Sequence, residues 1–157
     1  MSDTPHAKFT RLKSDAERKS FYAQLAGAKW WLGGNKRGSH FSWVNVFENS
    51  DGKCVYCSRD LAASTDALAE STEEHLVPRS VLEANGLLSD SEHNMAVCCA
   101  GCNGLKAGHV PAPAHPCWKN RKAYVKECAR FVAECRLKNF LKYKEHVEKV
   151  LRKRAGQ

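Results

Sequence analysis

The chain has 157 residues and a formal net charge of +8, and 43% of its residues are hydrophobic and 27% charged. This length fits one domain that carries helical extensions. We expect no transmembrane helix, because no run of about 18 apolar residues occurs, and no secretory signal, because the first residues lack an apolar region. We therefore expect a cytoplasmic protein with no membrane partner, whose cysteines stay reduced and serve metals or the core rather than disulfides.

The composition divides the chain into three parts. The middle part is rich in Cys, Gly and Asn, which predicts loops and hairpins around a site, and the prolines from Pro111 to Pro116 form a rigid linker after it. The three parts are an N-terminal helical extension (1–49), a core (50–110) and a basic C-terminal helical extension (117–157).

The N-terminal part contains one clear helix signal. Ser14 is a suitable N-cap for a helix over Asp15–Leu32, and Gly33-Gly34 ends it. The segment Phe41–Phe47 alternates loosely, which is compatible with a short strand or a helical turn.

The C-terminal part predicts one long helix over Trp118–Arg154, with a possible break near Asn139. Apolar residues recur there with helical spacing, first at Tyr124, Cys128, Phe131 and Cys135, and then at Tyr143, Val147, Val150 and Leu151. This face could join two copies of the chain, so we expect a homodimer through the C-terminal helix as one option.

The positive charge is concentrated in the same C-terminal part. Residues 118–157 contain 13 Lys and Arg but four Asp and Glu, a net charge of +9, whereas residues 1–117 carry −1. Such asymmetry favours nucleic acid as a partner over an anionic membrane surface, with a merely solvated helix face as the alternative.

Four cysteines form two pairs with metal-ligand spacing, Cys54-x2-Cys57 and Cys99-x2-Cys102. Two such turns suit tetrahedral zinc in a closed structural site, and the metal would contribute folding energy to a segment with few large apolar residues. Ordinary reduced cysteines or a redox pair are weaker alternatives. Cys98 competes with Cys99 as a ligand, but the spacing favours Cys99.

Three further cysteines could form a second metal site with His115, but we favour the interpretation that these cysteines are small residues of the core. They are Cys117, Cys128 and Cys135. The remaining histidines have no convergent motif and are expected to be ordinary surface or core residues; they are His6, His40, His93, His109 and His146.

Between the cysteine pairs lies Glu74-His75-Leu-Val-Pro, then Asn94, and the second pair continues as Cys102-Asn103-Gly-Leu-Lys106. This order resembles the HNH endonuclease family, the zinc-containing His-Me finger nucleases. Their pattern is C-x2-C, Asp-His-x-x-Pro, Asn, and C-x2-C-(Asn or His)-x-x-Lys. The resemblance covers residues 53–108, with Glu74 standing where Asp is usual.

The resemblance implies an α+β fold in which a small ββα-metal core is stapled by a four-cysteine zinc site. An N-terminal helix and a long basic C-terminal helix would flank this core. It also implies a metal-dependent endonuclease with His75 as general base and Asn94 holding the His75 loop through backbone hydrogen bonds. Glu74 and Asn103 would ligate catalytic Mg²⁺ or Mn²⁺, because both offer oxygen donors.

Phosphate contacts are expected from Lys106 and Arg79, and from Lys122, Lys126 and Arg130 on the basic helix. DNA is the expected substrate, although nothing in the sequence decides between DNA and RNA. The alternative is a zinc-containing module that binds nucleic acid without cutting it. Sequence specificity and biological role stay open.

Overall fold

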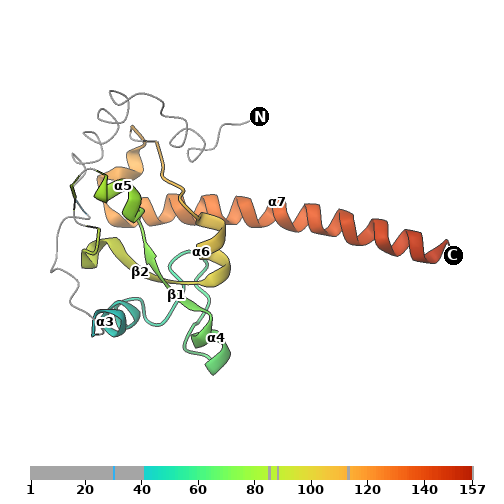
Figure 1. Cartoon of the computed structure of the whole chain (residues 1–157), viewed down its shortest axis with the longest axis horizontal. Helices are drawn as coiled ribbons and strands as arrows, with labels where there is room; N and C mark the ends of the chain where they lie inside the picture. Colours follow the sequence, from blue (N-terminus) through green and yellow to red (C-terminus); the bar gives the residue numbers. More distant parts are fainter. Residues whose placement is uncertain (1–29, 31–40, 85, 88, 113, 157) are drawn as a thin grey trace.

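The computed structural model describes residue 30 and residues 41–84, 86–87, 89–112 and 114–156. The chain is a mixture of helix and strand, with a small sheet and a long C-terminal helix (Figure 1). Apart from Trp30, the helix expected over Asp15–Leu32 lies outside the described residues. In chain order the elements are α3 (Phe41–Asn49), α4 (Thr65–Ala69), β1 (Ser71–His75), α5 (Arg79–Glu83), η2 (Glu92–Asn94), β2 (Met95–Cys99), α6 (Ala100–Lys106), η3 (Pro116–Lys119) and α7 (Arg121–Ala155).

The segment that allowed either a strand or a helical turn is helix α3. The chain leaves α3 through Gly52, whose amide donates to the carbonyl oxygen of Phe47 at 3.0 Å. Gly52 has a φ of +61°, and a side chain there would meet the Phe47 ring at 3.1 Å. Glycine is therefore required at this turn, which leads directly into the first cysteine pair.

Strands β1 and β2 form a two-stranded antiparallel sheet in which His75 pairs with Met95 and Glu74 with Ala96. Successive side chains of a strand point to opposite faces. Thr72 and Glu74 therefore share one face, and His75 lies on the other. All five residues of β2 are buried, because elements cover this strand on both sides.

Helix α6 follows β2 without a loop and packs on the sheet face of Thr72 and Glu74. Asn103 of α6 donates to the Thr72 hydroxyl at 3.1 Å, and Lys106, one turn later, pairs with Glu74. The order strand, strand, helix thus brings the ends of both strands and the first turns of α6 into one small region.

Helix α7 anchors the core through Tyr124, which is fully buried and donates its hydroxyl to the Leu76 carbonyl at 3.0 Å. Its ring centroid lies 4.6 Å from that of Trp118. The side chain of Asn120 caps α7 by accepting from the Ala123 amide at 2.8 Å.

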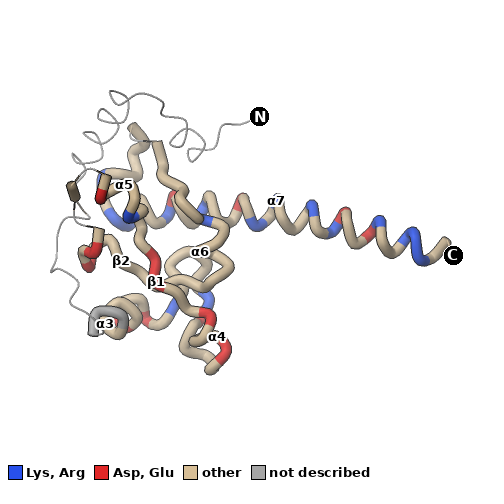
Figure 2. The backbone as a smooth tube through the Cα atoms, viewed as in Figure 1, with Lys and Arg blue, Asp and Glu red and all other residues tan. Residues whose placement is uncertain are grey.

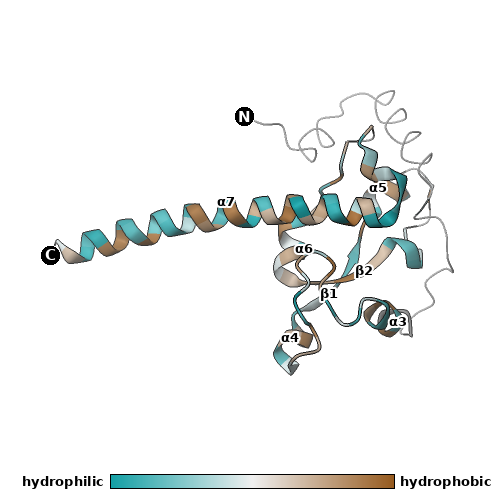
Figure 3. Cartoon of the chain, turned by 180° about the vertical axis from the view of Figure 1, so that it is seen from behind, coloured by the Kyte–Doolittle hydropathy of each residue, from teal (hydrophilic) through white to brown (hydrophobic). Residues whose placement is uncertain are grey.

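Helix α7 runs for 35 residues without the break considered near Asn139. Its first half packs against the core through Tyr124, Cys128 and Val132, which are buried. Its second half extends beyond the other described elements (Figures 1 and 3). Large apolar side chains stay exposed there, at Leu137, Phe140, Leu141, Tyr143, Val147, Val150 and Leu151.

Within the described part of the chain, no helix has both the length and the apolar character needed to cross a membrane.

Candidate functional site

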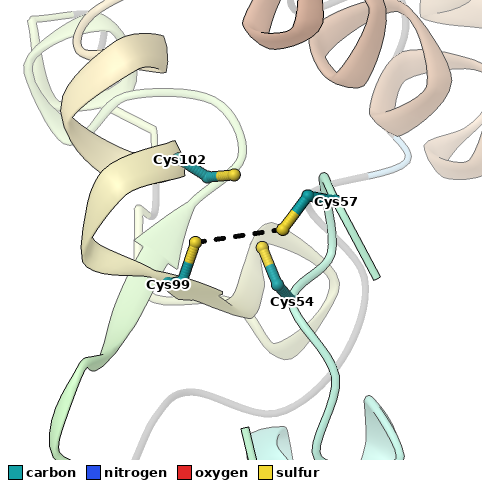
Figure 4. Close-up of side chains that lie close together, drawn as sticks. All are labelled: Cys54, Cys57, Cys99 and Cys102. Atoms are coloured by element: carbon teal, nitrogen blue, oxygen red, sulfur yellow. Dashed lines mark hydrogen bonds between the residues drawn. The ribbon is translucent and has the colours of Figure 1, made fainter. Parts of the chain in front are cut away.

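The four cysteines expected to bind zinc meet at one point (Figure 4). Their sulfur atoms all lie within 4.8 Å of one another, and the Sγ atoms of Cys57 and Cys99 are 3.9 Å apart. A tetrahedral zinc with Zn–S bonds of about 2.3 Å would separate its sulfur ligands by about 3.8 Å. The cluster can therefore hold a structural metal such as zinc.

A backbone hydrogen bond and the start of helix α6 position the two cysteine pairs next to each other. The Val55 amide, inside the first pair, donates to the Val97 carbonyl of β2 at 2.9 Å, which docks this turn onto the strand. Strand β2 ends at Cys99, and α6 begins immediately after it, so Cys102 lies in the first turn of the helix. Cys98 points away from the cluster, with its Sγ atom 3.3 Å from the Thr72 hydroxyl.

The other cysteines do not form a second cluster. Among the described residues, the four-cysteine group is the one set of three or more Cys, His, Asp or Glu side chains close enough to share a metal. Cys117 and Cys128 are buried in the hydrophobic core, as the core interpretation expects, whereas Cys135 is only partly buried and lies outside the core cluster. Phe131 stacks on the buried ring of His109, with ring centroids 3.6 Å apart.

A guanidinium group from α7 contacts the cysteine cluster. Arg136 donates from Nη2 to the Cys102 sulfur at 2.9 Å, and the charge on that sulfur is the largest cause that raises the pKa of Arg136. Four thiolates on Zn²⁺ carry a net negative charge, so a cation here offsets part of it. No sequence pattern points to Arg136, because it lies 34 positions after Cys102.

The thiol of Cys57 differs electrostatically from that of Cys102. At Cys57, burial is the largest single influence and raises the pKa, but hydrogen bonds from the Arg59 backbone and from neighbouring cysteines together outweigh it and lower the pKa to about 7. Burial raises the pKa of Cys102. Metal binding must deprotonate such thiols, so affinity for a thiolate-bound metal falls as the pH falls.

The expected general base, His75, is the last residue of β1 and is partly buried. Its Nε2 atom is 2.7 Å from Oδ1 of Asp90, and the side chains of His75 and Asp90 are 16% and 33% exposed. A carboxylate at this distance fixes the orientation of the imidazole ring. Asp90 was also missed, since a single aspartate 15 positions away in a loop gives no sequence signal.

Asn94 is the last residue of η2, immediately before β2, and is fully buried. Its Oδ1 atom accepts from the Val77 amide at 2.8 Å, and its Nδ2 atom donates to the carbonyl oxygens of Val77 and Ser89 at 2.9 Å each. These bonds join the loop that follows His75 to the loop that carries Asp90. Asn94 therefore positions both members of the His75–Asp90 pair.

Glu74, expected to be a metal ligand, is held in a buried ion pair instead of facing solvent. Its Oε1 atom bonds the ammonium group of Lys106 and accepts from the Tyr56 hydroxyl at 2.9 Å. Burial, and then the charge of Glu74, raises the pKa of Tyr56 well above its usual value, so its hydroxyl stays protonated and donates. The strand alternation that turns His75 outward turns Glu74 toward α6.

Lys106 corrects one expectation from the sequence. It was expected to contact phosphate, but only 1% of the residue is exposed, and its Nζ atom also donates to the His75 carbonyl at 3.1 Å. The helical spacing places Lys106 on the same face of α6 as Asn103, as expected, but that face is turned toward the sheet. In this structure Lys106 cannot reach a nucleic acid.

Asn103 and Glu74 extend from facing elements, and together they offer an amide and a carboxylate, donors of the type that Mg²⁺ prefers. The amide of Asn103 is half-buried and bonds Thr72. The donor set thus fits a divalent cation in kind, but the cation on Glu74 is the ammonium group of Lys106.

The other residues expected to contact nucleic acid lie at the surface. Arg79 is exposed and pairs with Glu83 at 3.1 Å. Lys122, Lys126 and Arg130 are exposed at four-residue intervals on α7, and this spacing puts them on one face of the helix. Lys and Arg recur along the whole of α7 (Figure 2). Arg130 pairs with Glu127 and Glu134, so its charge is largely compensated within the helix.

Comparison with known proteins finds no family model, no curated protein and no solved structure that matches this chain.

Proposed function

We propose that this protein is a metal-dependent HNH endonuclease that hydrolyses phosphodiester bonds in DNA, with His75 as its general base. The observation that carries the proposal is the partly exposed His75–Asp90 pair, with 2.7 Å between Nε2 and Oδ1. A histidine that is partly exposed and oriented by a carboxylate has an arrangement that suits general-base catalysis.

In this mechanism Asp90 accepts a hydrogen bond from Nε2–H of His75, which leaves Nδ1 unprotonated. Nδ1 takes a proton from a water molecule as the water oxygen forms a bond to phosphorus. The bond from phosphorus to the leaving oxygen breaks, and that oxygen receives a proton from solvent. The carboxylate of Asp90 stabilises the imidazolium that has formed.

Two metals belong to the proposal. Strands β1 and β2 with helix α6 constitute the ββα-metal core, and Glu74 and Asn103 hold Mg²⁺ or Mn²⁺. When bound, this ion neutralises the charge that develops on the phosphate. Zinc on the four cysteines is structural and stabilises the fold, because a closed site with four sulfur ligands has no position for a reacting water.

DNA binding is assigned to α7, whose exposed lysines Lys122 and Lys126 supply charge near the first turns of the helix. Contacts to phosphate predict binding that weakens steeply as salt is added. One active site cuts one strand, so a monomer nicks duplex DNA, and a dimer through α7 makes double-strand breaks.

The test is nicking of supercoiled plasmid by the zinc-loaded protein in Mg²⁺, Mn²⁺ or EDTA. We expect nicking that EDTA abolishes and that His75→Ala loses while remaining folded. His93→Ala is the matched control, because His93 is an exposed histidine that forms no part of the site. Equal activity of His75→Ala and wild type would reject His75 as the base.

Asp90→Asn tests the orienting role of Asp90. The amide keeps the size of the side chain but removes its charge, so we expect a lower kcat with little change in KM. A variant with wild-type kcat would show that the 2.7 Å contact to His75 has no part in turnover.

One observation favours a second candidate, a zinc module that binds nucleic acid without cutting it. In this structure the ammonium group of Lys106 occupies the carboxylate of Glu74, which is the expected metal ligand. If wild type and His75→Ala both bind DNA but neither cuts DNA or RNA with any divalent metal, the binding module is the correct function.

A further inference from the structure

The ion pair between Glu74 and Lys106 is the most deeply buried pair of opposite charges among the ion pairs of the described residues, with side chains 5% and 1% exposed. Taking both charges out of water is unfavourable unless they bond each other and further polar groups. Here the ammonium also donates to the His75 carbonyl, and the carboxylate also accepts from Tyr56.

The Tyr56 hydroxyl donates to Oε1 of Glu74 at 2.9 Å, and the ammonium group of Lys106 bonds the same oxygen. A phenol hydroxyl carries no positive charge, so this hydrogen bond does not neutralise the carboxylate. The positive charge that this structure places on Glu74 is the ammonium group of Lys106.

The oxygens that bind this ammonium are a carboxylate oxygen and a backbone carbonyl oxygen. Divalent cations such as Mg²⁺ and Mn²⁺ prefer the same class of ligand. Asn103, one helical turn before Lys106, brings an amide to the same face of the sheet. Lys106 thus lies among the donors that would otherwise be offered to a metal ion.

We propose that Lys106 is an internal cation that competes with a divalent metal for Glu74, so that the metal binds only when the ammonium group leaves. This inference deepens the proposed nuclease and rests on Glu74 being its metal ligand. With Lys106 in place the carboxylate is already neutralised, and a dication next to the ammonium would be repelled. The strength of this pair therefore sets the metal affinity of the site.

The test measures Mn²⁺ binding to the zinc-loaded full chain through the loss of the free-ion EPR signal. We expect Lys106→Met to bind one Mn²⁺ per chain at least tenfold more tightly than wild type. The double variant Glu74→Gln/Lys106→Met should lose this gain, because its carboxylate is gone. Lys138→Met, which removes an exposed lysine from α7 that belongs to no proposed site, should bind Mn²⁺ as wild type does.

Unchanged Mn²⁺ affinity in Lys106→Met would overturn the proposal, as would a gain that survives in the double variant. Removal of Lys106 leaves Glu74 buried without a counter-ion, so the variant can lose its fold in metal-free buffer. Refolding on addition of Mn²⁺ would then support the competition, and failure to refold would count against it. Lys106→Gln retains an amide donor for Glu74 and the His75 carbonyl and allows the same titration in a less perturbed chain.

The outcomes separate this inference from the proposed function. If wild type nicks DNA with Mg²⁺ while Lys106→Met binds Mn²⁺ no better than wild type, the nuclease stands and the competition is rejected. If Lys106→Met binds Mn²⁺ tightly in a chain that never cuts nucleic acid, the competition stands and the nuclease is rejected.

Discussion

Replacement of Asn94 by alanine should destabilise the fold more than any other asparagine substitution discussed above. The side chain of Asn94 is fully buried and forms three hydrogen bonds, all with backbone groups of the loop that follows His75 and the loop that carries Asp90. Alanine removes every one of these partners and fills none of the space. The backbone groups then stay buried without a hydrogen bond.

The cost follows from the number of bonds. Each hydrogen bond contributes about 1 kcal/mol net, and buried groups left unsatisfied cost more, so the total is about 3–5 kcal/mol. A domain of this size is stable by about 5–15 kcal/mol, so the variant should be folded only marginally. A water molecule that enters the vacated space would bring the cost toward the lower value.

The assay is equilibrium urea unfolding of the zinc-loaded protein, followed by tryptophan fluorescence, to which buried Trp118 contributes. Asn120→Ala is the matched control, because Asn120 forms one exposed bond as the N-cap of α7, and such a cap is worth about 1 kcal/mol. The reasoning is refuted if Asn94→Ala lowers the free energy of unfolding no more than Asn120→Ala does.

Further outcomes are expected at the metal sites and on α7. Cys57→Ala should lose zinc and the circular dichroism of the folded core, and a normal melting temperature without zinc would contradict a scaffold role. Asn103→Ala should slow nicking at low Mg²⁺ and recover in part at high Mn²⁺, whereas unchanged kinetics at low metal would remove Asn103 as a ligand. Lys122→Glu should weaken DNA binding and flatten its dependence on salt, and equal salt slopes for variant and wild type would place the DNA elsewhere. Phe140→Glu should convert a dimer to a monomer in analytical ultracentrifugation, and a monomeric wild type would exclude the homodimer.

The cysteine cluster could be predicted because its signal is local. A C-x2-C spacing is itself a tight turn that aims two sulfurs at one point, and Cys99 rather than Cys98 was favoured by spacing alone. Helix α7 was predictable for the same reason, since Tyr124 and Cys128 repeat at the helical period. What the sequence could not show is that the apolar side chains from Leu137 onward stay exposed among the residues that the structure describes.

The side-chain contacts that define the candidate site join residues far apart in the sequence, and no sequence motif predicts these contacts. Asp90 approaches His75 from a loop, and Arg136 approaches Cys102 from another helix. The spacing of Asn103 and Lys106 correctly predicted a shared face of α6, but not that this face is turned inward onto Glu74. The segment Phe41–Phe47 stayed ambiguous because short apolar runs fit strands and helices equally.

Two arginine side chains of helix α7 form hydrogen bonds with the core at points far apart along the helix. Arg121 donates to the carbonyl oxygens of His93 and Met95 at one end of β2, and Arg136 donates to Cys102 beyond the other end. At the rise of an α-helix these arginines are about 22 Å apart along its axis. Helix α7 is therefore bound to the core near both ends of β2, in addition to its buried side chains Tyr124, Cys128 and Val132. A metal on the cysteine cluster would keep the sulfur of Cys102 deprotonated and so favour its contact with the guanidinium group of Arg136.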